Sequence, residues 1–177
     1  LNSLQRASIK DAYVDDILKD NIARVKAMML VNDSLNPGNN SDNKAISPVT
    51  FIADIAEHTK KMFARSASVD IRLKIDGALV LSATAGLCLG LIVTELITNS
   101  CKHAFAAQPH PQIDIEILVA GDCWKMHYRD NGSGIGDQSG ETLGLFLIAD
   151  LTRQLKGDYN IGKHDGVSYL FNFPNPD

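Results

Sequence analysis

The sequence predicts an α+β protein in which helices pack on a mostly antiparallel sheet. Segments with the two-residue period of strands, or with strand composition beside a turn, are 69–75, 112–119, 123–130, 158–163 and 167–173. Segments with the three- and four-residue spacing of helices are 1–35, 47–64, 84–105 and 143–156. At 177 residues the chain suits one well-buried domain with a helical extension.

Composition is that of an ordinary soluble globular protein and excludes several classes. Apolar residues make up 45% and charged residues 21%, and the net charge of -4 opposes nucleic-acid binding, which requires a basic face. Three cysteines without a CxxC motif and five scattered histidines predict neither a disulfide framework nor a zinc site, and indicate a reducing, cytoplasmic setting. The apolar run 85–97 is too short to cross a bilayer, so we expect no membrane segment.

The first residues predict helices that precede the main domain. An apolar stripe, which includes Val14, Leu18, Val25 and Met28, steps by three or four residues as in a helical bundle. A break near residues 10–12 would divide this part into two antiparallel helices. We assign 1–36 to this helical region, 37–45 to a turn-rich linker and 46–177 to the main domain. Because the chain starts with Leu and not Met, we expect it to be a piece of a longer protein.

The main domain opens with a helix and a strand. Ser47 followed by Pro48 is a typical N-cap and first-turn pair, and it predicts a helix through about residue 64. Alternating apolar and charged residues over 69–75 then predict a half-buried strand.

One side of the helix expected over 84–105 carries four polar residues. Glu95, Asn99, Lys102 and His103 follow one another at gaps of four, three and one, which a helical period places along one face. A solvated helix face gives the same pattern. A carboxylate, an amide, an amine and an imidazole on one face also make a candidate site.

A glycine-rich loop and a last helix lie between two predicted hairpins. The loop, DNGSGIGDQSGET at 130–142, holds four glycines in thirteen residues and is expected to be mobile. The helix over 143–156 is predicted to end at Gly157 as its left-handed C′ residue.

Four motifs, ELITNSCKHAF, RDNGSGI, ETLGLFLIADL and DGVSYLFNFP, occur in the order and spacing of one family. They resemble the catalytic and ATP-binding domain of sensor histidine kinases, which are GHKL ATPases. The resemblance covers about 46–174 and implies a two-layer α/β sandwich of the Bergerat type, shared with gyrase-type and mismatch-repair ATPases. ARVKAMMLVNDSL resembles the end of the dimerisation and phosphotransfer hairpin of one histidine kinase branch, so 1–36 would be a remnant of that hairpin.

The resemblance implies roles for individual residues. Asn99 matches the magnesium-binding asparagine at the nucleotide, and Glu95 matches the catalytic carboxylate that orients a metal-bound water or accepts the nucleophile's proton. Lys102 and His103 would neutralise phosphate charge. Asp130 matches the aspartate that accepts a hydrogen bond from the adenine amino group.

The other nucleotide contacts implied by the resemblance are Gly132, Gly134, Ile135, Thr142, Leu143 and Gly144. The first three would lie at the base, and the last three at a helix N-terminus whose free amides suit a triphosphate. Two features depart from the family: the lid loop is short, and Val167 follows Gly166 where relatives often have a threonine.

The resemblance implies that Mg²⁺ and ATP are bound and that the γ-phosphoryl passes to a histidine and then to a response regulator receiver domain. No histidine precedes His58, so we expect the acceptor outside this chain and no autophosphorylation by the chain alone. The apolar stripe implies a homodimer through a four-helix bundle, or packing on the sandwich. The alternatives are a serine kinase of the anti-sigma type and a non-catalytic phosphotransfer scaffold with a degenerate site.

Overall fold

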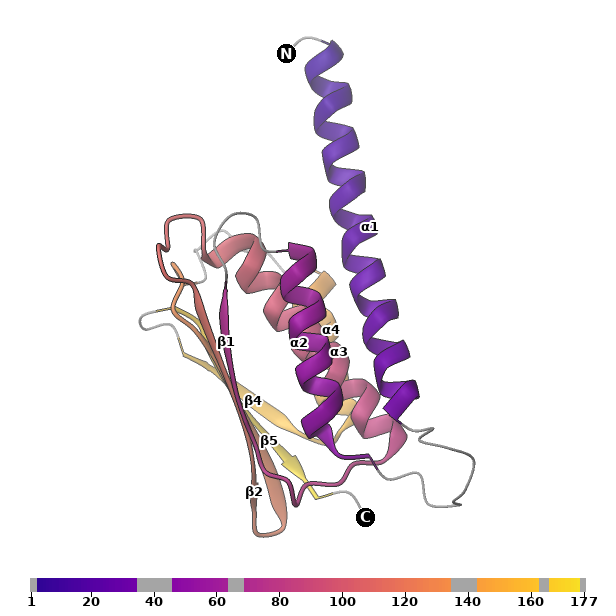
Figure 1. Ribbon diagram of the computed structural model, residues 1–177, viewed down its shortest axis with the longest axis vertical. Coiled ribbons are helices and arrows are strands. Elements are labelled where there is room, and N and C mark those ends of the chain that lie inside the picture. Colours follow the sequence, from indigo (N-terminus) through magenta and orange to yellow (C-terminus); the bar gives the residue numbers. More distant parts are fainter. Residues whose placement is uncertain (1–2, 35–45, 64–68, 135–142, 163–165, 176–177) are drawn as a thin grey trace.

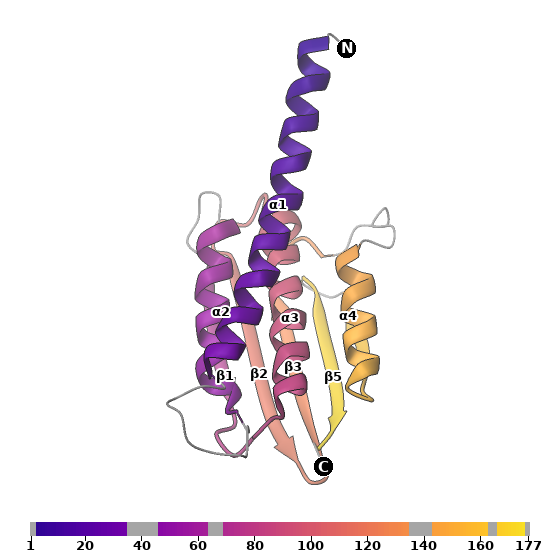
Figure 2. The ribbon, with the colours of Figure 1, turned by 90° about the vertical axis from the view of Figure 1, so that its right-hand side faces the viewer.

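A five-stranded sheet carries helices on one face, and a long helix lies across those helices (Figures 1 and 2). The structure, a computed structural model, describes residues 3–34, 46–63, 69–134, 143–162 and 166–175. The elements are α1 (Ser3–Ser34), α2 (Pro48–Phe63), β1 (Asp70–Ile75), α3 (Ala83–Asn99), the π-helical turn η1 (Ser100–Ala104), β2 (Gln112–Ala120), β3 (Cys123–Asp130), α4 (Leu143–Gln154), β4 (Asp158–Gly162) and β5 (Ser168–Pro174). The predicted α/β sandwich is confirmed, and the linker predicted at 37–45 lies outside the described residues.

The sheet has the strand order β1-β2-β3-β5-β4. Only the β1–β2 pair is parallel, and both predicted hairpins are antiparallel pairs in the described strands. The register pairs Asp130 at the end of β3 with Ile113 of β2, and Arg129 with Ser168 at the start of β5. Asp130 therefore lies on the middle strand, at the end of the sheet where β2 and β5 begin and β3 ends.

The central helix α3 is apolar because it is buried on nearly all sides. The hydroxyl of Ser82 caps it by accepting a hydrogen bond from the Ala85 amide at 3.2 Å. At Gly90, a Cβ atom would lie 3.0 Å from Ile55 and 3.1 Å from Val31, so the glycine lets α1 and α2 pack closely. Residues 83–104 form a helix of 22 residues that is apolar and long enough to span a membrane, and it is longer than the predicted run. Most of this helix is buried within the protein.

The prediction of two helices in the first 35 residues is wrong, because α1 is continuous from Ser3 to Ser34. Lys10, Asp11 and Ala12 include neither glycine nor proline, and nothing in their chemistry interrupts the helix. Figure 1 shows the first half of α1 extending beyond the sandwich, whereas its second half lies over α2 and α3.

The side of α1 that packs on the sandwich is not the apolar stripe. Ala23, Ala27 and Val31 are buried at 4%, 2% and 2% exposure, and Ala27 and Val31 belong to the hydrophobic core cluster. The residues of the apolar stripe are 42–55% exposed. The alternative in which this stripe packs on the sandwich is therefore wrong. Small side chains at a four-residue spacing form the contact instead.

The end of α4 also differs from the prediction. The residue with left-handed backbone is Lys156, at φ 55°, and Gly157 does not have a positive φ. A Cβ atom at Gly157 would lie 2.6 Å from the Asn172 carbonyl oxygen and would overlap the Phe173 ring. Close packing on β5 therefore requires this glycine, and the backbone conformation does not.

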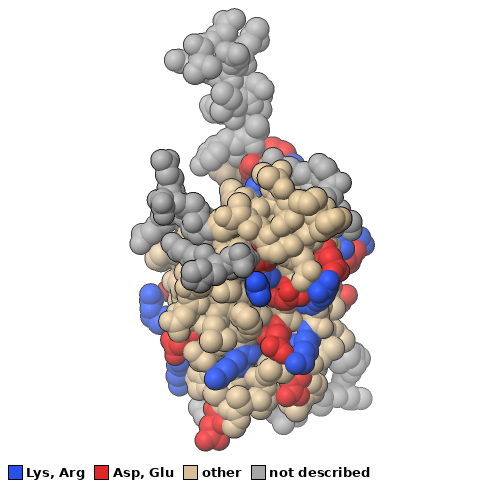
Figure 3. Space-filling model, turned by 90° about the vertical axis from the view of Figure 1, so that its left-hand side faces the viewer, with Lys and Arg blue, Asp and Glu red and all other residues tan. Residues whose placement is uncertain are grey.

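The outer face of the sheet is solvated, and Figure 3 shows charges of both signs interspersed on it. Lys74 of β1, for example, binds Glu116 of β2 at 2.6 Å. Apolar side chains of the inner face, such as Trp124 and Phe173, stack with their ring centroids 4.2 Å apart. The inner face of the sheet is thus filled by apolar side chains, whereas its outer face carries paired charges.

Candidate functional site

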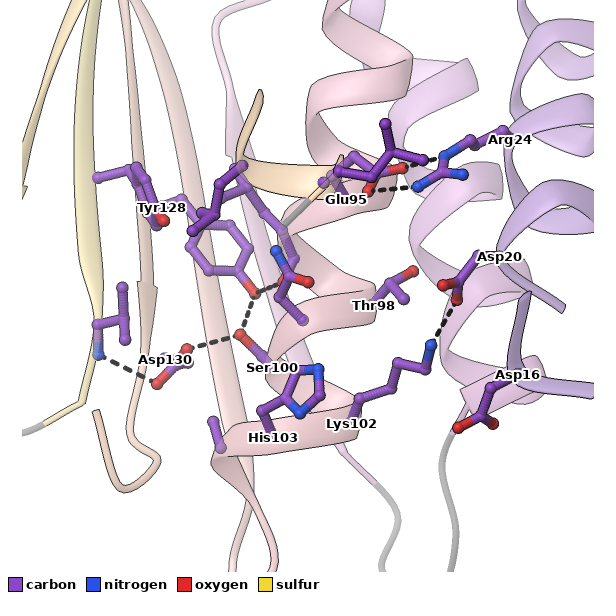
Figure 4. A pocket seen from close by; sticks show the side chains of 18 of the residues that line it. Asp16, Asp20, Arg24, Glu95, Thr98, Ser100, Lys102, His103, Tyr128 and Asp130 are labelled. Carbon is purple, nitrogen blue, oxygen red and sulfur yellow. Dashed lines mark hydrogen bonds and ion pairs between the residues drawn. The ribbon is translucent and has the colours of Figure 1, made fainter. Parts of the chain in front are cut away.

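A cavity of about 910 Å³ lies between α3 with η1 and the adjoining ends of β3 and β5. The start of α4 and the middle of α1 also line it (Figure 4). The residues predicted from the sequence that line this cavity are Glu95, Asn99, Lys102, His103, Asp130, Gly134, Leu143 and Gly144. Ile135 and Thr142 lie outside the described residues. Segments that are far apart in the sequence thus meet at one site.

Asp130 is buried at 3% exposure at the sheet end of the cavity, and protein donors fill most of its acceptor positions. Its Oδ1 accepts hydrogen bonds from the Gly132 amide at 2.9 Å and the Val167 amide at 3.2 Å. Its Oδ2 accepts one from the Ser100 hydroxyl at 2.5 Å. A carboxylate oxygen has two lone pairs, so Oδ2 retains one acceptor position for a ligand.

Ser100 links Asp130 to a buried tyrosine. Its Oγ lies 2.7 Å from the Tyr128 hydroxyl, which also donates to the Leu96 carbonyl at 3.0 Å. Burial raises the pKa of Tyr128 well above its usual value, so the phenol stays neutral. Ser100 was not predicted from the sequence as a site residue, although it follows Asn99 directly. The Ser100 hydroxyl and the Val167 amide both donate to Asp130.

Glycines make the turn around Asp130 possible. Gly166 has φ 105°, and a Cβ atom there would overlap the Asp130 carbonyl oxygen. A Cβ atom at Gly132 would lie 2.6 Å from the Ala104 carbonyl oxygen, so Gly132 packs the loop against η1. Gly132 is not part of the cavity lining, and its amide holds Asp130. Gly134, at φ 80°, does line the cavity.

The central helix widens to a π-helical turn at Ser100, and its polar side chains point in two directions. Ser100 points toward Asp130, whereas Glu95 and Lys102 point toward α1 (Figure 4). His103 is exposed at the rim of the cavity, and Asn99 is half-buried between the two ends. All four residues of the predicted face line the cavity, but Glu95 and Lys102 are paired with α1.

The start of α4 lies against the carboxylate of the central helix. A Cβ atom at Gly144 would lie 2.7 Å from Glu95 Oε2 and 3.7 Å from the Asn99 carboxamide. A side chain at this position would displace the Glu95 carboxylate, so glycine lets Glu95 and Asn99 lie beside the helix N-terminus. Leu143, by contrast, is 69% exposed at the cavity mouth.

Two ion pairs join α1 to the central helix. Arg24 donates from Nε to Glu95 Oε1 at 2.6 Å and from Nη2 to Oε2 at 3.0 Å. Lys102 Nζ donates to Asp20 Oδ1 at 2.7 Å. The hydrogen bond to Glu95 raises the pKa of Arg24 above its usual value. Asp20 and Arg24 were not predicted from the sequence as site residues. Their four-residue spacing on the side of α1 away from the apolar stripe was the one available signal.

Thr98 adds an unused donor to this side of the cavity. The residue is 5% exposed, and its Oγ1 has no hydrogen-bond partner among the described residues. Figure 4 shows it between α3 and α1. Buried hydroxyls are usually paired, so this one is available to a polar ligand. For a metal, the oxygen donors beside Gly144 are the Asn99 carboxamide and the Glu95 carboxylate, the ligand types that magnesium prefers.

The chain is similar to several known proteins. Residues 86–177, just over half of the chain, match the profile of histidine kinase-, DNA gyrase B- and HSP90-like ATPases. The serine-protein kinase RsbW of Listeria monocytogenes is 33% identical over 92 residues, which cover 42% of this chain and 59% of RsbW. Sensor protein LytS of Staphylococcus epidermidis is 30% identical over 73 residues, which cover 41% of this chain and 12% of LytS. The chain thus spans less than two thirds of either relative.

Among solved structures, the histidine kinase domain of the blue-light activated histidine kinase from Erythrobacter litoralis EL346 has the same fold. It superposes with a TM-score of 0.79 at 20% identity and covers 88% of this chain and 75% of that domain. The overlap extends beyond the residues that match the family profile, into the elements that precede residue 86.

Proposed function

The chain belongs to the histidine kinase-, DNA gyrase B- and HSP90-like ATPases, and from this premise we propose that it binds Mg-ATP as the kinase module of a two-component sensor histidine kinase. The γ-phosphoryl group passes to a histidine outside this chain and then to the receiver domain of a response regulator. We also propose a cytoplasmic location.

The observation that carries the ATP site is the single unused acceptor position of Asp130. With three protein donors already bound, the carboxylate accepts one N–H from the cavity, and the 6-amino group of adenine supplies one. Guanine has a carbonyl oxygen at that position, which a carboxylate repels. The site thereby selects adenine.

The other end of the cavity suits a magnesium-bound triphosphate. A magnesium ion bound there would bridge phosphate oxygens and neutralise their charge. Asn99 supplies a neutral oxygen ligand, and Glu95 accepts a hydrogen bond from a metal-bound water or a proton from the nucleophile. Lys102 and the Thr98 hydroxyl, which has no partner among the described residues, supply donors to phosphate oxygens.

Calorimetric titration with ATP, in the presence and absence of magnesium, tests the assignment. We expect Asp130→Ala to abolish binding under both conditions, because adenine loses its acceptor. Asn99→Ala should remove only the enhancement by magnesium, and Asn160→Ala, an exposed asparagine on β4, is the matched control. Unchanged binding by both site variants would contradict the assignment.

A second candidate function is a protein serine kinase, which the similarity to the serine-protein kinase RsbW favours. Phosphorylation of the protein in its natural length with radiolabelled ATP distinguishes the two. Phosphohistidine is lost in acid and stable in alkali, whereas phosphoserine is stable in acid. Acid-stable label would overturn the histidine kinase assignment and retain the ATP site.

We also propose a homodimer through the apolar stripe of α1, whose residues are 42–55% exposed. Leu18→Glu places a charge in its centre and should yield a monomer by light scattering. A wild-type chain that is monomeric at high concentration would contradict this proposal.

A further inference from the structure

The two ion pairs from α1 engage the groups that the proposed phosphate end requires. Glu95 has both oxygens bound to the Arg24 guanidinium, at 2.6 and 3.0 Å. Lys102 is bound to Asp20 at 2.7 Å. The side chains of the first pair are 16% and 5% exposed and those of the second 13% and 26%, so water and salt screen both pairs less than a surface pair.

These contacts withhold the side chains from phosphoryl transfer. A carboxylate whose two oxygens are bound by a guanidinium must break that pair before it orients a metal-bound water or accepts a proton. The charge of Lys102 is likewise neutralised by Asp20, and its amine lies 5.5 Å from the ring centre of Phe63. Neither group is free for its proposed role in this arrangement.

The charge contributed by α1 also opposes a polyanion. The charged side chains among the described residues that line the cavity are Asp16, Asp20, Arg24, Glu95, Lys102 and Asp130, a formal net charge of -2 with His103 neutral. The three from α1 account for half of that excess. Coulomb repulsion of the triphosphate is therefore greater with α1 in place.

The packing of α1 provides a contact that can be released. Ala23, Ala27 and Val31 bury one narrow side of the helix, while the residues of the apolar stripe stay exposed on the other. Small side chains bury less area than leucine or phenylalanine would, so a modest free energy separates the packed and displaced positions.

We infer that the packing of α1 on α3 is an autoinhibitory contact, in which Arg24 and Asp20 act as positioning residues that hold Glu95 and Lys102 away from Mg-ATP. Displacement of α1 from the phosphate end frees both groups. Mg-ATP and the seated α1 therefore compete, whereas the adenine end stays open in both positions. This inference rests on the proposed nucleotide site.

Calorimetric titration of the whole chain with Mg-ATP and, separately, with adenosine tests the contact. Asp20→Asn keeps the shape of the side chain and removes its charge, so we expect Mg-ATP to bind about three- to tenfold more tightly. Adenosine affinity should not change, because adenosine lacks phosphates. Asp33→Asn, an exposed position further along α1, is the charge-matched control.

Arg24→Gln provides the second variant. It frees Glu95, so the magnesium concentration for half-maximal ATP binding should fall about threefold or more. Thermal unfolding monitors whether the variant folds. Asp20→Asn that binds Mg-ATP no more tightly than Asp33→Asn overturns the inference. So does Arg24→Gln that weakens ATP binding at saturating magnesium, because Arg24 would then be a phosphate ligand. A wild-type chain that binds neither adenosine nor Mg-ATP overturns the proposed function itself.

Discussion

Replacing Asp130 with asparagine should turn the adenine acceptor into a donor. In the wild type, Oδ1 accepts two amide hydrogen bonds, from Gly132 at 2.9 Å and from Val167 at 3.2 Å. The asparagine carbonyl oxygen must stay at that position, which places Nδ2 where Oδ2 was. Nδ2 then donates one hydrogen to the Ser100 hydroxyl and directs the other into the cavity, toward the amino group of adenine.

The size of the effect follows from the hydrogen bonds involved. Loss of a hydrogen bond to a charged acceptor costs about 1.5–3 kcal/mol, and two facing donors add desolvation, so ATP binding should weaken about 100-fold. Guanine presents an acceptor at the same position, so the preference for ATP over GTP should fall by a similar factor or invert. A neutral acceptor for the two amides should lower the free energy of unfolding by about 1–2 kcal/mol.

Displacement of a fluorescent ATP analogue by ATP and by GTP measures the preference, and urea unfolding measures the stability. Asp114→Asn is the control, because Asp114 lies on the neighbouring strand and bonds to Gln112 at 2.8 Å, away from the cavity. A folded Asp130→Asn variant with an unchanged ratio of ATP to GTP affinity would refute the assignment of this carboxylate as the adenine acceptor.

Three further predictions concern single residues near the site and in the core. Ser100→Ala removes the one protein donor to Asp130 Oδ2 among the described residues, so ATP affinity should fall about three- to tenfold by calorimetry; equal affinity would show that Ser100 does not orient the carboxylate. Gly157→Ala places a Cβ atom 2.6 Å from the Asn172 carbonyl oxygen, so the free energy of unfolding in urea should drop by about 1–3 kcal/mol, and an unchanged midpoint would contradict the packing role. Burial raises the pKa of Cys101 to about 12, so its thiol stays protonated near neutral pH, and iodoacetamide should modify it far more slowly in the native chain than in urea; equal rates would contradict this.

Much of the fold is predictable because its signals are local. Alternation of apolar and charged residues specifies the strands, and the serine and proline at residues 47 and 48 mark the start of α2. The sequence misleads where one residue type serves two purposes. Gly157 was predicted to be the left-handed residue that ends a helix. Glycine is needed there because β5 approaches too closely for a side chain. A sequence pattern does not distinguish these two uses of glycine.

The sequence by itself determined the fold class and part of the candidate site, because motif order and helical spacing are properties of short segments. Glu95, Asn99 and Lys102 share one helix, and Asp130 ends a strand, so each was identifiable from its neighbours. Only the tertiary structure decided that Arg24, 71 residues before Glu95 in the sequence, binds both oxygens of that carboxylate. On an isolated helix a charged residue has the pattern of a solvated face, and only the packing of α1 against α3 supplies its partner.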